Sequence, residues 1–248
     1  MGAPVTGNSL SQKTVVLIGG SSGIGFAVAR AALDEGARVV IASSQQAKID
    51  TAVAGLGAGA EGSALEVTDE AAVAGFFERL GAFDHLVFTA GDWGARGGGS
   101  ISEVDLAGAH ATFGVRFWGA VTAIKHGSRM IAKDGSITLT DGMYAHRPTK
   151  GGAVNSAMLG AIEHLTRALA VDLAPIRVNA VCPGLILTEV WNSIPPDQRP
   201  ERIRRMTERQ PLARGGAPTE VAQAYLYLMR GGYTTGQVLR VDGGSSVV

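Results

Sequence analysis

A glycine-rich turn close to the start of the chain has the residue types and spacing that bind a phosphate group. Residues 14–18 form a short apolar run that predicts a buried strand, and glycines follow at positions 19, 20, 23 and 25. Small apolar residues from Phe26 onward predict a helix. A strand, a glycine turn and a helix in this order point backbone N–H groups and the positive end of a helix toward an anion. A glycine turn alone can be purely structural, but this order favours a nucleotide site.

Each of three glycines has a separate role in this interpretation. Gly19 lets the chain turn sharply, Gly23 lets a pyrophosphate approach the backbone, and Gly25 lets the helix pack closely on the strand. The other turn residues that we expect to contact the nucleotide are Ser21, Ser22 and Ile24.

A second group of reactive side chains follows a predicted strand at residues 136–140. Asp141 and Tyr144 stand just beyond it, and basic residues come next at His146, Arg147 and Lys150. A tyrosine near a cation can have a lowered pKa and give a proton to a carbonyl oxygen, and a carboxylic acid can supply a proton too. Tyr144 can equally be an ordinary loop aromatic, Asp141 a turn or helix cap, and the basic residues solvated loop positions.

The surrounding pattern predicts the elements that bring these loops together. Short apolar runs alternate with helical segments, which predicts an α/β fold with a single Rossmann-type, doubly wound parallel sheet of about seven strands and helices on both faces. The other strands are expected at residues 38–43, 63–67, 85–89, 177–181 and 237–241, and the longer helices at about 69–80, 102–130, 152–173 and 220–229. In such a sheet, ligands bind beyond the carboxyl ends of the strands, where the strand order reverses.

Composition limits the classes of partner. The chain has 248 residues with 22 Lys+Arg against 22 Asp+Glu, so no excess of positive charge indicates nucleic acid or a membrane surface as a partner. The single cysteine, Cys182, excludes a disulfide framework and a cysteine-rich metal site, and we expect no metal. We find neither a signal peptide nor an apolar run of about 18 residues, so we expect a cytoplasmic protein. Residues 1–13 are expected to be a flexible tail and residues 14–248 a single domain.

Several motifs in the same order resemble those of the short-chain dehydrogenase/reductase family, over about residues 12–244. They are the glycine turn, Ala90 and Gly91 after the fourth strand, RVNAVCPG at residues 177–184, Thr188, and VDGG at residues 241–244. The resemblance implies a nicotinamide dinucleotide, with Pro183, Gly184 and Thr188 over its nicotinamide half and Glu66 and Val67 beside its adenine. It also implies a homodimer or homotetramer that pairs through the two long helices.

The end of the second strand favours NADP(H) over NAD(H). An acidic residue there would accept hydrogen bonds from the ribose hydroxyls and repel a 2′-phosphate. Ser43 and Ser44 stand at this place, and the first acid, Asp50, lies within the following helix. Serine hydroxyls can donate to a phosphate, although no arginine beside them supplies the cation that a phosphate usually pairs with.

The residues at the family's catalytic positions are all different in this chain. The family uses a tyrosine as proton donor, a lysine four residues later, a serine thirteen residues earlier and an asparagine on the preceding helix. Counting back from the anchor at residues 165–167 without a gap puts Asn155 at the tyrosine position, Leu159 at the lysine position and Gly142 at the serine position. Within the motif at residues 115–119, Arg116 stands at the asparagine position. Arg116 can stabilise an alkoxide or bind a carboxylate, or it can form a structural ion pair between helices. The candidate catalytic residues are therefore Tyr144, Asp141, Arg116 and Asn155.

Three functions remain open at this point. The first is an oxidoreductase that acts on a carbonyl or hydroxyl of a hydrophobic small molecule with unusual acid and base groups. The second is a non-redox enzyme on the same fold, such as a cyclase, isomerase or lyase, and the third is a nucleotide-binding protein without catalysis. Residues 185–214 correspond to the family's variable lid, and Trp93, Met143 and Trp191 suggest an apolar or aromatic substrate.

Overall fold

The computed structural model describes residues 10–91 and 99–248, and its sheet has seven strands. Every neighbouring pair is parallel, in the order β3-β2-β1-β4-β5-β6-β7. The strands are β1 (Thr14–Ile18), β2 (Arg38–Ser43), β3 (Ala60–Ala64), β4 (Phe83–Phe88), β5 (Ile131–Thr140), β6 (Arg177–Pro183) and β7 (Val238–Val241). The predicted fold class is confirmed.

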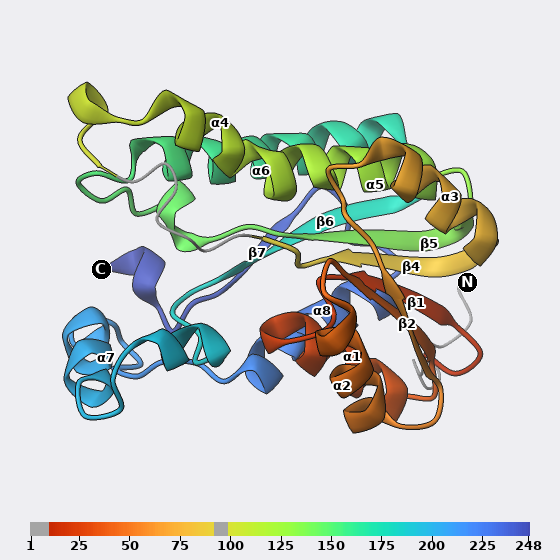
Figure 1. Ribbon diagram of the computed structural model, residues 1–248, viewed down its shortest axis with the longest axis horizontal. Helices are drawn as coiled ribbons and strands as arrows, with labels where there is room; N and C mark the ends of the chain where they lie inside the picture. The colour runs from red at the N-terminus through yellow and green to blue at the C-terminus, as the bar shows by residue number, and fades with distance from the viewer. Residues whose placement is uncertain (1–9, 92–98) are drawn as a thin grey trace.

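Helices cover both faces of this sheet (Figure 1). On one face lie α1 (Gly23–Asp34), α2 (Gln46–Leu56) and α8 (Pro218–Arg230), and on the other lie α3 (Glu70–Leu80), α4 (Leu106–Phe113), α5 (Gly119–Gly127) and α6 (Ala153–Asp172). Side chains alternate along a strand, so successive side chains of β1 enter the cores on opposite faces of the sheet. Val16 belongs to the core that contains Phe77 and Ile162. Val15 belongs to the core that contains Val28 and Tyr225. Burial on both faces explains why β1 and β2 are almost continuously apolar.

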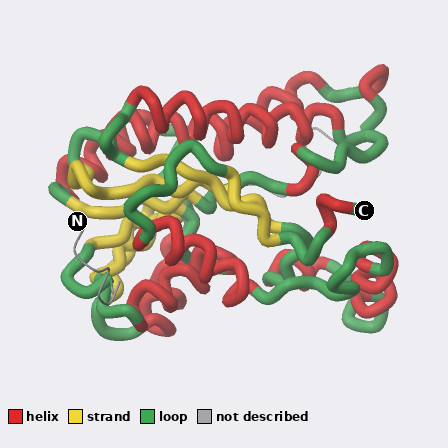
Figure 2. Tube along the Cα trace, turned by 180° about the vertical axis from the view of Figure 1, so that it is seen from behind, coloured by secondary structure: helices red, strands yellow, loops and turns green. Residues whose placement is uncertain are grey.

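The strand order reverses between β1 and β4, because the chain winds outward through β2 and β3 and then returns. The Gly19 N–H donates to the Ala42 carbonyl at 2.8 Å, and the Thr89 N–H donates to the Ile18 carbonyl at 2.8 Å, so the loops beyond β1 stay attached to both neighbours. Beyond the carboxyl ends of β6 and β7 lie the loops that carry α7 (Arg199–Thr207), as Figures 1 and 2 show from opposite sides.

Two predicted elements differ from the structure. The strand predicted at residues 63–67 lies at Ala60–Ala64, because Leu65 and Val67 are buried from the loop after the strand and imitate strand alternation. The long helix predicted at residues 102–130 is divided by a π-helical segment, Gly114–Trp118, which separates α4 from α5. Such π-helical segments are frequent at functional sites.

The predicted flexible tail is described only from Leu10 onward. Leu10 is buried in the core, and Lys13 Nζ lies 2.8 Å from Asp84 Oδ1, so residues 10–13 belong to the folded domain. Trp93 lies outside the described residues. Among the helices that are described, none has the length and apolar character needed to cross a membrane.

A buried histidine makes the stability of the fold depend on pH. His85 Nδ1 lies 2.9 Å from Ser136 Oγ, and burial lowers the pKa of His85 from 6.5 to about 4. Between these two values the unfolded chain binds a proton that the folded chain does not, so acid favours unfolding. We expect the free energy of unfolding to fall by up to about 3 kcal/mol from this residue as the pH drops from 6.5 toward 4.

Chemical denaturation across that pH range checks this expectation with two variants. His85→Asn, which can keep a hydrogen bond to Ser136, should show a shallower decline than the native chain. His164→Asn, at an exposed position of α6, should keep the full decline. Equal slopes for native protein and His85→Asn would contradict the assignment.

Candidate active site

The glycine turn closes tightly against the ends of β1 and β4. Gly19 has a φ of 97°, and a Cβ at this position would overlap the backbone nitrogen of Ala90. A Cβ on Gly25 would overlap the Gly19 carbonyl oxygen, so α1 touches the turn backbone to backbone. The Thr89 hydroxyl donates to the same Gly19 carbonyl at 3.1 Å, which fixes the turn from the β4 side. The first turn of α1 is thus held at the point where the strand order reverses, where an anion is favoured.

Serine hydroxyls lie where the turn meets the end of β2. Ser21 Oγ and Ser43 Oγ are 3.0 Å apart, and the side chains of Ser22 and Ser44 are exposed beside them. Ser22 precedes α1 but its side chain makes no capping hydrogen bond, so it leaves the first N–H groups of that helix to another acceptor. No carboxylate follows β2 directly. The four serine hydroxyls at the end of β2 and in the glycine turn therefore offer hydrogen-bond donors with no carboxylate among them.

The segment after β6 lies against the glycine turn. Pro183 ends β6, and the Gly184 N–H donates to the Val241 carbonyl at 3.0 Å. A Cβ on Gly23 would lie 3.3 Å from Thr188 Cγ2, so the two motifs are in contact. In the loop after β3, Val67 is buried, while the exposed Glu66 accepts a hydrogen bond from Thr68 Oγ1 at 2.9 Å.

Arg116 lies buried against the loop after β4. It belongs to the π-helical segment and is only 4% exposed. A Cβ on Gly91 would overlap its guanidinium group, so the guanidinium lies directly against the Gly91 backbone. Burial raises the pKa of the Tyr225 hydroxyl, which lies 2.7 Å from Thr140 Oγ1, and the Arg116 guanidinium acts against this rise.

Asp141 is fully buried at the end of β5, in a group with three side chains from other elements. An oxygen of Asp141, a ring nitrogen of His146 and Cys182 Sγ all lie within 4.8 Å of one another. Glu163, on α6, places its Oε1 atom 2.5 Å from His146 Nε2. Burial and then the neighbouring Glu163 carboxyl raise the pKa of Asp141 to about 8. Burial, together with Asp141, also raises the pKa of the Cys182 thiol.

The other two catalytic candidates stand apart from this group. Tyr144 is 40% exposed in the short turn Met143–Ala145, and Asn155 is half-buried near the start of α6. Neither side chain forms a hydrogen bond or ion pair within the described part of the chain. Leu159, which we expect at the position of the family's lysine, is buried.

Sequence reasoning missed Glu163 and underrated His146, which it treated as a solvated loop residue. A signal for Glu163 existed: it follows Asn155 and Leu159 at intervals of four, so the three share one helix face. An acidic residue on the helix face that carries the catalytic positions is unusual enough to mark a site. The contact between His146 and Glu163 depends on the path of the loop after β5, which the sequence pattern does not predict.

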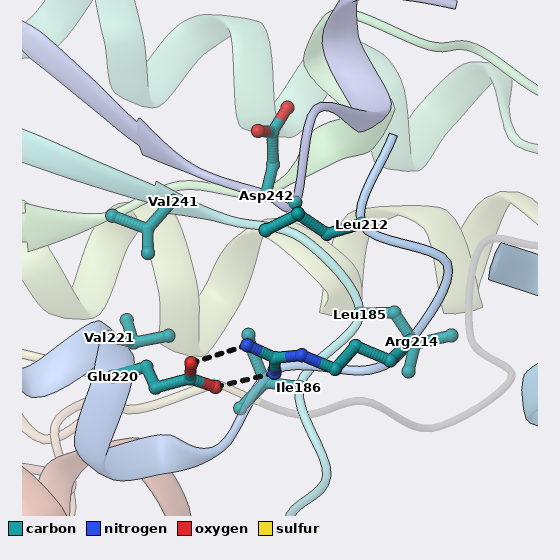
Figure 3. Close-up of a pocket in the computed structure, with 10 residues that line it drawn as sticks. Leu185, Ile186, Leu212, Arg214, Glu220, Val221, Val241 and Asp242 are labelled. Carbon is teal, nitrogen blue, oxygen red and sulfur yellow. Dashed lines mark hydrogen bonds and ion pairs between the residues drawn. The ribbon is translucent and has the colours of Figure 1, made fainter. Parts of the chain in front are cut away.

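A hollow lies at the base of the predicted lid (Figure 3). Arg214 and Glu220 face each other there through two hydrogen bonds of 2.8 and 2.7 Å. The Leu187 N–H donates to the Gly216 carbonyl, and the Gly216 N–H donates to the Leu185 carbonyl, both at 2.9 Å. The two ends of the segment are therefore joined side by side, while α7 lies between them in the sequence.

Sequence comparisons with known proteins identify the family of this chain. Residues 19–246 match a family model described as Enoyl-(Acyl carrier protein) reductase. The short-chain dehydrogenase/reductase ucsE of Acremonium sp is 34% identical over 261 aligned positions, which cover 98% of each chain. The chain belongs to the short-chain dehydrogenase/reductase family.

Solved structures of the family superpose on nearly the whole chain. A small-chain dehydrogenase in complex with NADPH has a TM-score of 0.83 and 37% identity, covering 96% of this chain and 100% of that one. The MalC Reductase/Diels-Alderase from Malbranchea aurantiaca has a TM-score of 0.88 and 30% identity, covering 95% of this chain and 96% of that one. The family's relatives in these comparisons are dehydrogenases and reductases.

The close contact at Gly25 gives a test on stability. Gly25→Ala adds a Cβ that would overlap backbone atoms of Gly19, so we expect a loss of about 1–3 kcal/mol in the free energy of unfolding, despite the better helix propensity of alanine. Gly160→Ala is the matched control, because it lies within α6 and has no atom within 4 Å of a built Cβ. Denaturant unfolding should show a gain of up to about 1 kcal/mol for this control. Similar gains in both variants would contradict the packing described.

Proposed function

We propose that the protein is an NADP(H)-dependent oxidoreductase that acts on a carbonyl or hydroxyl carbon of a hydrophobic small molecule. The nicotinamide supplies the hydride when the cofactor is bound, and the protein supplies position and electrostatics. The observation that carries this proposal is the pair of hydroxyls of Ser21 and Ser43, 3.0 Å apart, at the place where a carboxylate would repel a 2′-phosphate. The similarity to a dehydrogenase solved with NADPH supports the same choice.

Arg116 is the residue that we assign to the reacting oxygen. Reduction of a carbonyl places negative charge on its oxygen, and a buried cation held in position stabilises that charge more strongly than water does. The family's lysine is replaced by Leu159, so the cationic group comes from a different element, the π-helical segment. Gly91 holds the guanidinium plane against the end of β4.

The substrate enters under the segment at residues 185–214, which we propose as a lid. Its ends are joined through the backbone contacts of Leu187 and Gly216, and Arg214 is held by Glu220. Such anchoring lets the middle of the segment move while its base stays fixed, which is how lids exclude water from a reaction. The exposed apolar side chains of Leu187, Val190 and Leu212 on this segment suit an apolar substrate.

A cyclisation without hydride transfer is the second candidate. Neither Asn155 nor Leu159 can replace the family's tyrosine and lysine as proton donor and cation. The similar MalC protein bears the description Reductase/Diels-Alderase, which couples reduction and a non-redox reaction in one name. Product formed without oxidation of the cofactor would favour this candidate.

Cofactor choice is tested by giving the chain the missing carboxylate. In Ser43→Asp we expect the affinity for NADPH to fall at least about tenfold while the affinity for NADH changes little, because the new charge repels only the 2′-phosphate. Titration of nicotinamide fluorescence measures both affinities. Ser128→Asp adds the same charge between α5 and the start of β5, at the amino ends of the strands, and should alter neither. An equal loss for both cofactors in Ser43→Asp would contradict the assignment.

The role of Arg116 is tested by removing its charge while keeping an unbranched side chain. In Arg116→Met we expect turnover to fall by about 10²–10³-fold, with NADPH affinity unchanged, because the lost stabilisation acts on the transition state. Arg79→Met, at an exposed position near the end of α3, is the control and should keep native turnover. Native turnover in Arg116→Met would exclude the guanidinium from the reaction.

A further inference from the structure

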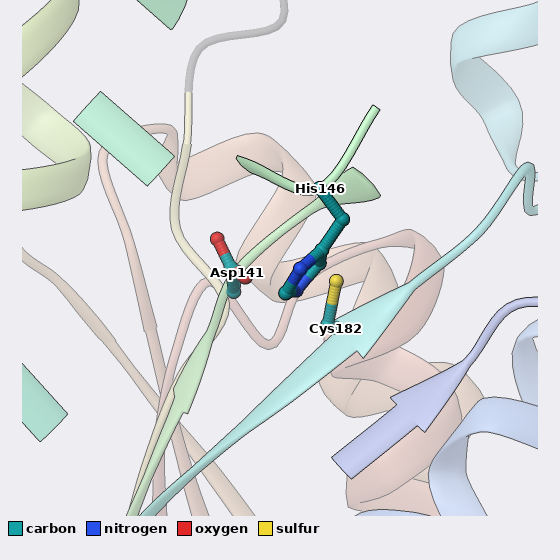
Figure 4. A group of neighbouring side chains, drawn as sticks. All are labelled: Asp141, His146 and Cys182. Atoms are coloured by element: carbon teal, nitrogen blue, oxygen red, sulfur yellow. The ribbon is translucent and has the colours of Figure 1, made fainter. Parts of the chain in front are cut away.

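A set of buried donor atoms lies beside the crevice at the ends of two neighbouring strands. Figure 4 shows Asp141 at the end of β5, Cys182 in β6 and His146 in the turn that follows β5. One donor atom of each lies within 4.8 Å of the other two. Asp141 and Cys182 have no exposed surface, so water does not solvate these groups.

The main chain holds these donors in place. Thr140 and Val181 are partners in the β5–β6 register, and the Asp141 N–H donates to the Val181 carbonyl at 2.8 Å, so Asp141 and Cys182 are adjacent across the sheet. The His146 N–H donates to the Met143 carbonyl at 3.0 Å, which turns the loop back over the strand ends. The proximity of the donors thus follows from strand register and one short turn.

Several polar atoms in this group are buried and lack hydrogen bonds. Both carboxylate oxygens of Asp141 have no hydrogen-bond partner among the described residues, and the same holds for His146 Nε2 and Glu163 Oε1. The last two atoms are 2.5 Å apart, yet their geometry is not that of a hydrogen bond. In the described part of the chain, Arg167 reaches only the other oxygen of Glu163, at 3.3 Å, and no ion pair involves Asp141. A buried carboxylate without an ion-pair partner is costly, so the surroundings of Asp141 are suited to a cation.

We propose that Asp141, His146 and Cys182 bind a divalent transition-metal ion, with zinc as the best match. A thiolate, an imidazole and a carboxylate form a donor set that zinc favours, and three protein ligands leave one position open. Glu163 acts on the imidazole rather than on the metal: metal-bound histidines commonly contact a carboxylate through their second nitrogen, which fixes the ring. The sequence led us to expect no metal. The proposed ligands come from separate parts of the chain, so no motif in the sequence marks them as a site.

The geometry requires only small movements. Donor atoms around a tetrahedral zinc ion lie roughly 3.3–3.8 Å apart, so the side chains would close by about 1 Å from their present positions. The His146 side chain is 18% exposed and gives the ion a route from solvent. Binding releases the thiol proton of Cys182 and any proton on Asp141 to water. The bound ion would neutralise the buried carboxyl groups and hold the loop between β5 and α6.

Cobalt binding by the full-length protein tests the site. The protein is prepared without a histidine tag, dialysed against a chelator and titrated with Co²⁺, followed by absorption spectra and metal analysis. We expect one ion per chain, a thiolate-to-cobalt charge-transfer band, and loss of that band when zinc is added. Cys182 is the only cysteine in the sequence, so a thiolate band can arise from no other residue.

Variants separate the site from adventitious binding. Cys182→Ser should abolish the band, and Glu163→Gln should weaken Co²⁺ binding about 10–100-fold while keeping the band. His164→Asn, at an exposed position of α6, should bind as the native chain does. The proposal is overturned if the folded native protein binds no cobalt, or binds it without a thiolate band. In that case a proton shared by Asp141 and Glu163, rather than a metal ion, compensates the buried carboxyl groups. NADPH affinity of the metal-free protein is measured separately, so loss of the metal site is distinguishable from loss of the cofactor site.

Discussion

The contact between α1 and the end of β1 is the constraint on which the rest of the structure depends. Gly25 lies against the Gly19 carbonyl, and a single added carbon at either residue would overlap backbone atoms. This contact directs the first turn of α1 into the point where the strand order reverses, between β1 and β4. The loops after β2, β4 and β6 then converge on that point because parallel strands end at one edge. Cofactor binding, access of the substrate and the position of Arg116 all follow from this edge.

Buried charged groups lie around the ends of β4 and β5. Carboxyl groups are buried at Asp141 and Glu163, and the apolar Leu159 is buried on the same helix as Glu163. The Arg116 cation is buried in the π-helical segment and packs against Gly91. We propose that these groups set the electrostatic environment of the substrate, because one fold supports several chemistries through the residues of its site.

Sequence reasoning reached the fold because its signals are local and redundant. The glycine turn, the alternation of strands and helices, and the closing motif each indicate the same parallel sheet, and six of the seven strands were predicted close to their positions. It misplaced β3, since Leu65 and Val67 are buried from a loop, and it could not see the π-helical segment, which no spacing of apolar residues distinguishes from a helix. The group around Asp141 was equally hidden, because its members come from two strands, a turn and a helix. Proximity of that kind depends on strand register and the path of one loop.

Transfer of a label from the cofactor tests the central claim most directly. The protein is incubated with NADPH that carries deuterium at the transferable position and with a panel of hydrophobic ketones, and the products are examined by mass spectrometry. Our account predicts an alcohol that contains one deuterium, formed in equal amount to oxidised cofactor. A product that forms without deuterium while the bound cofactor stays reduced would contradict it and establish a non-redox enzyme on this fold.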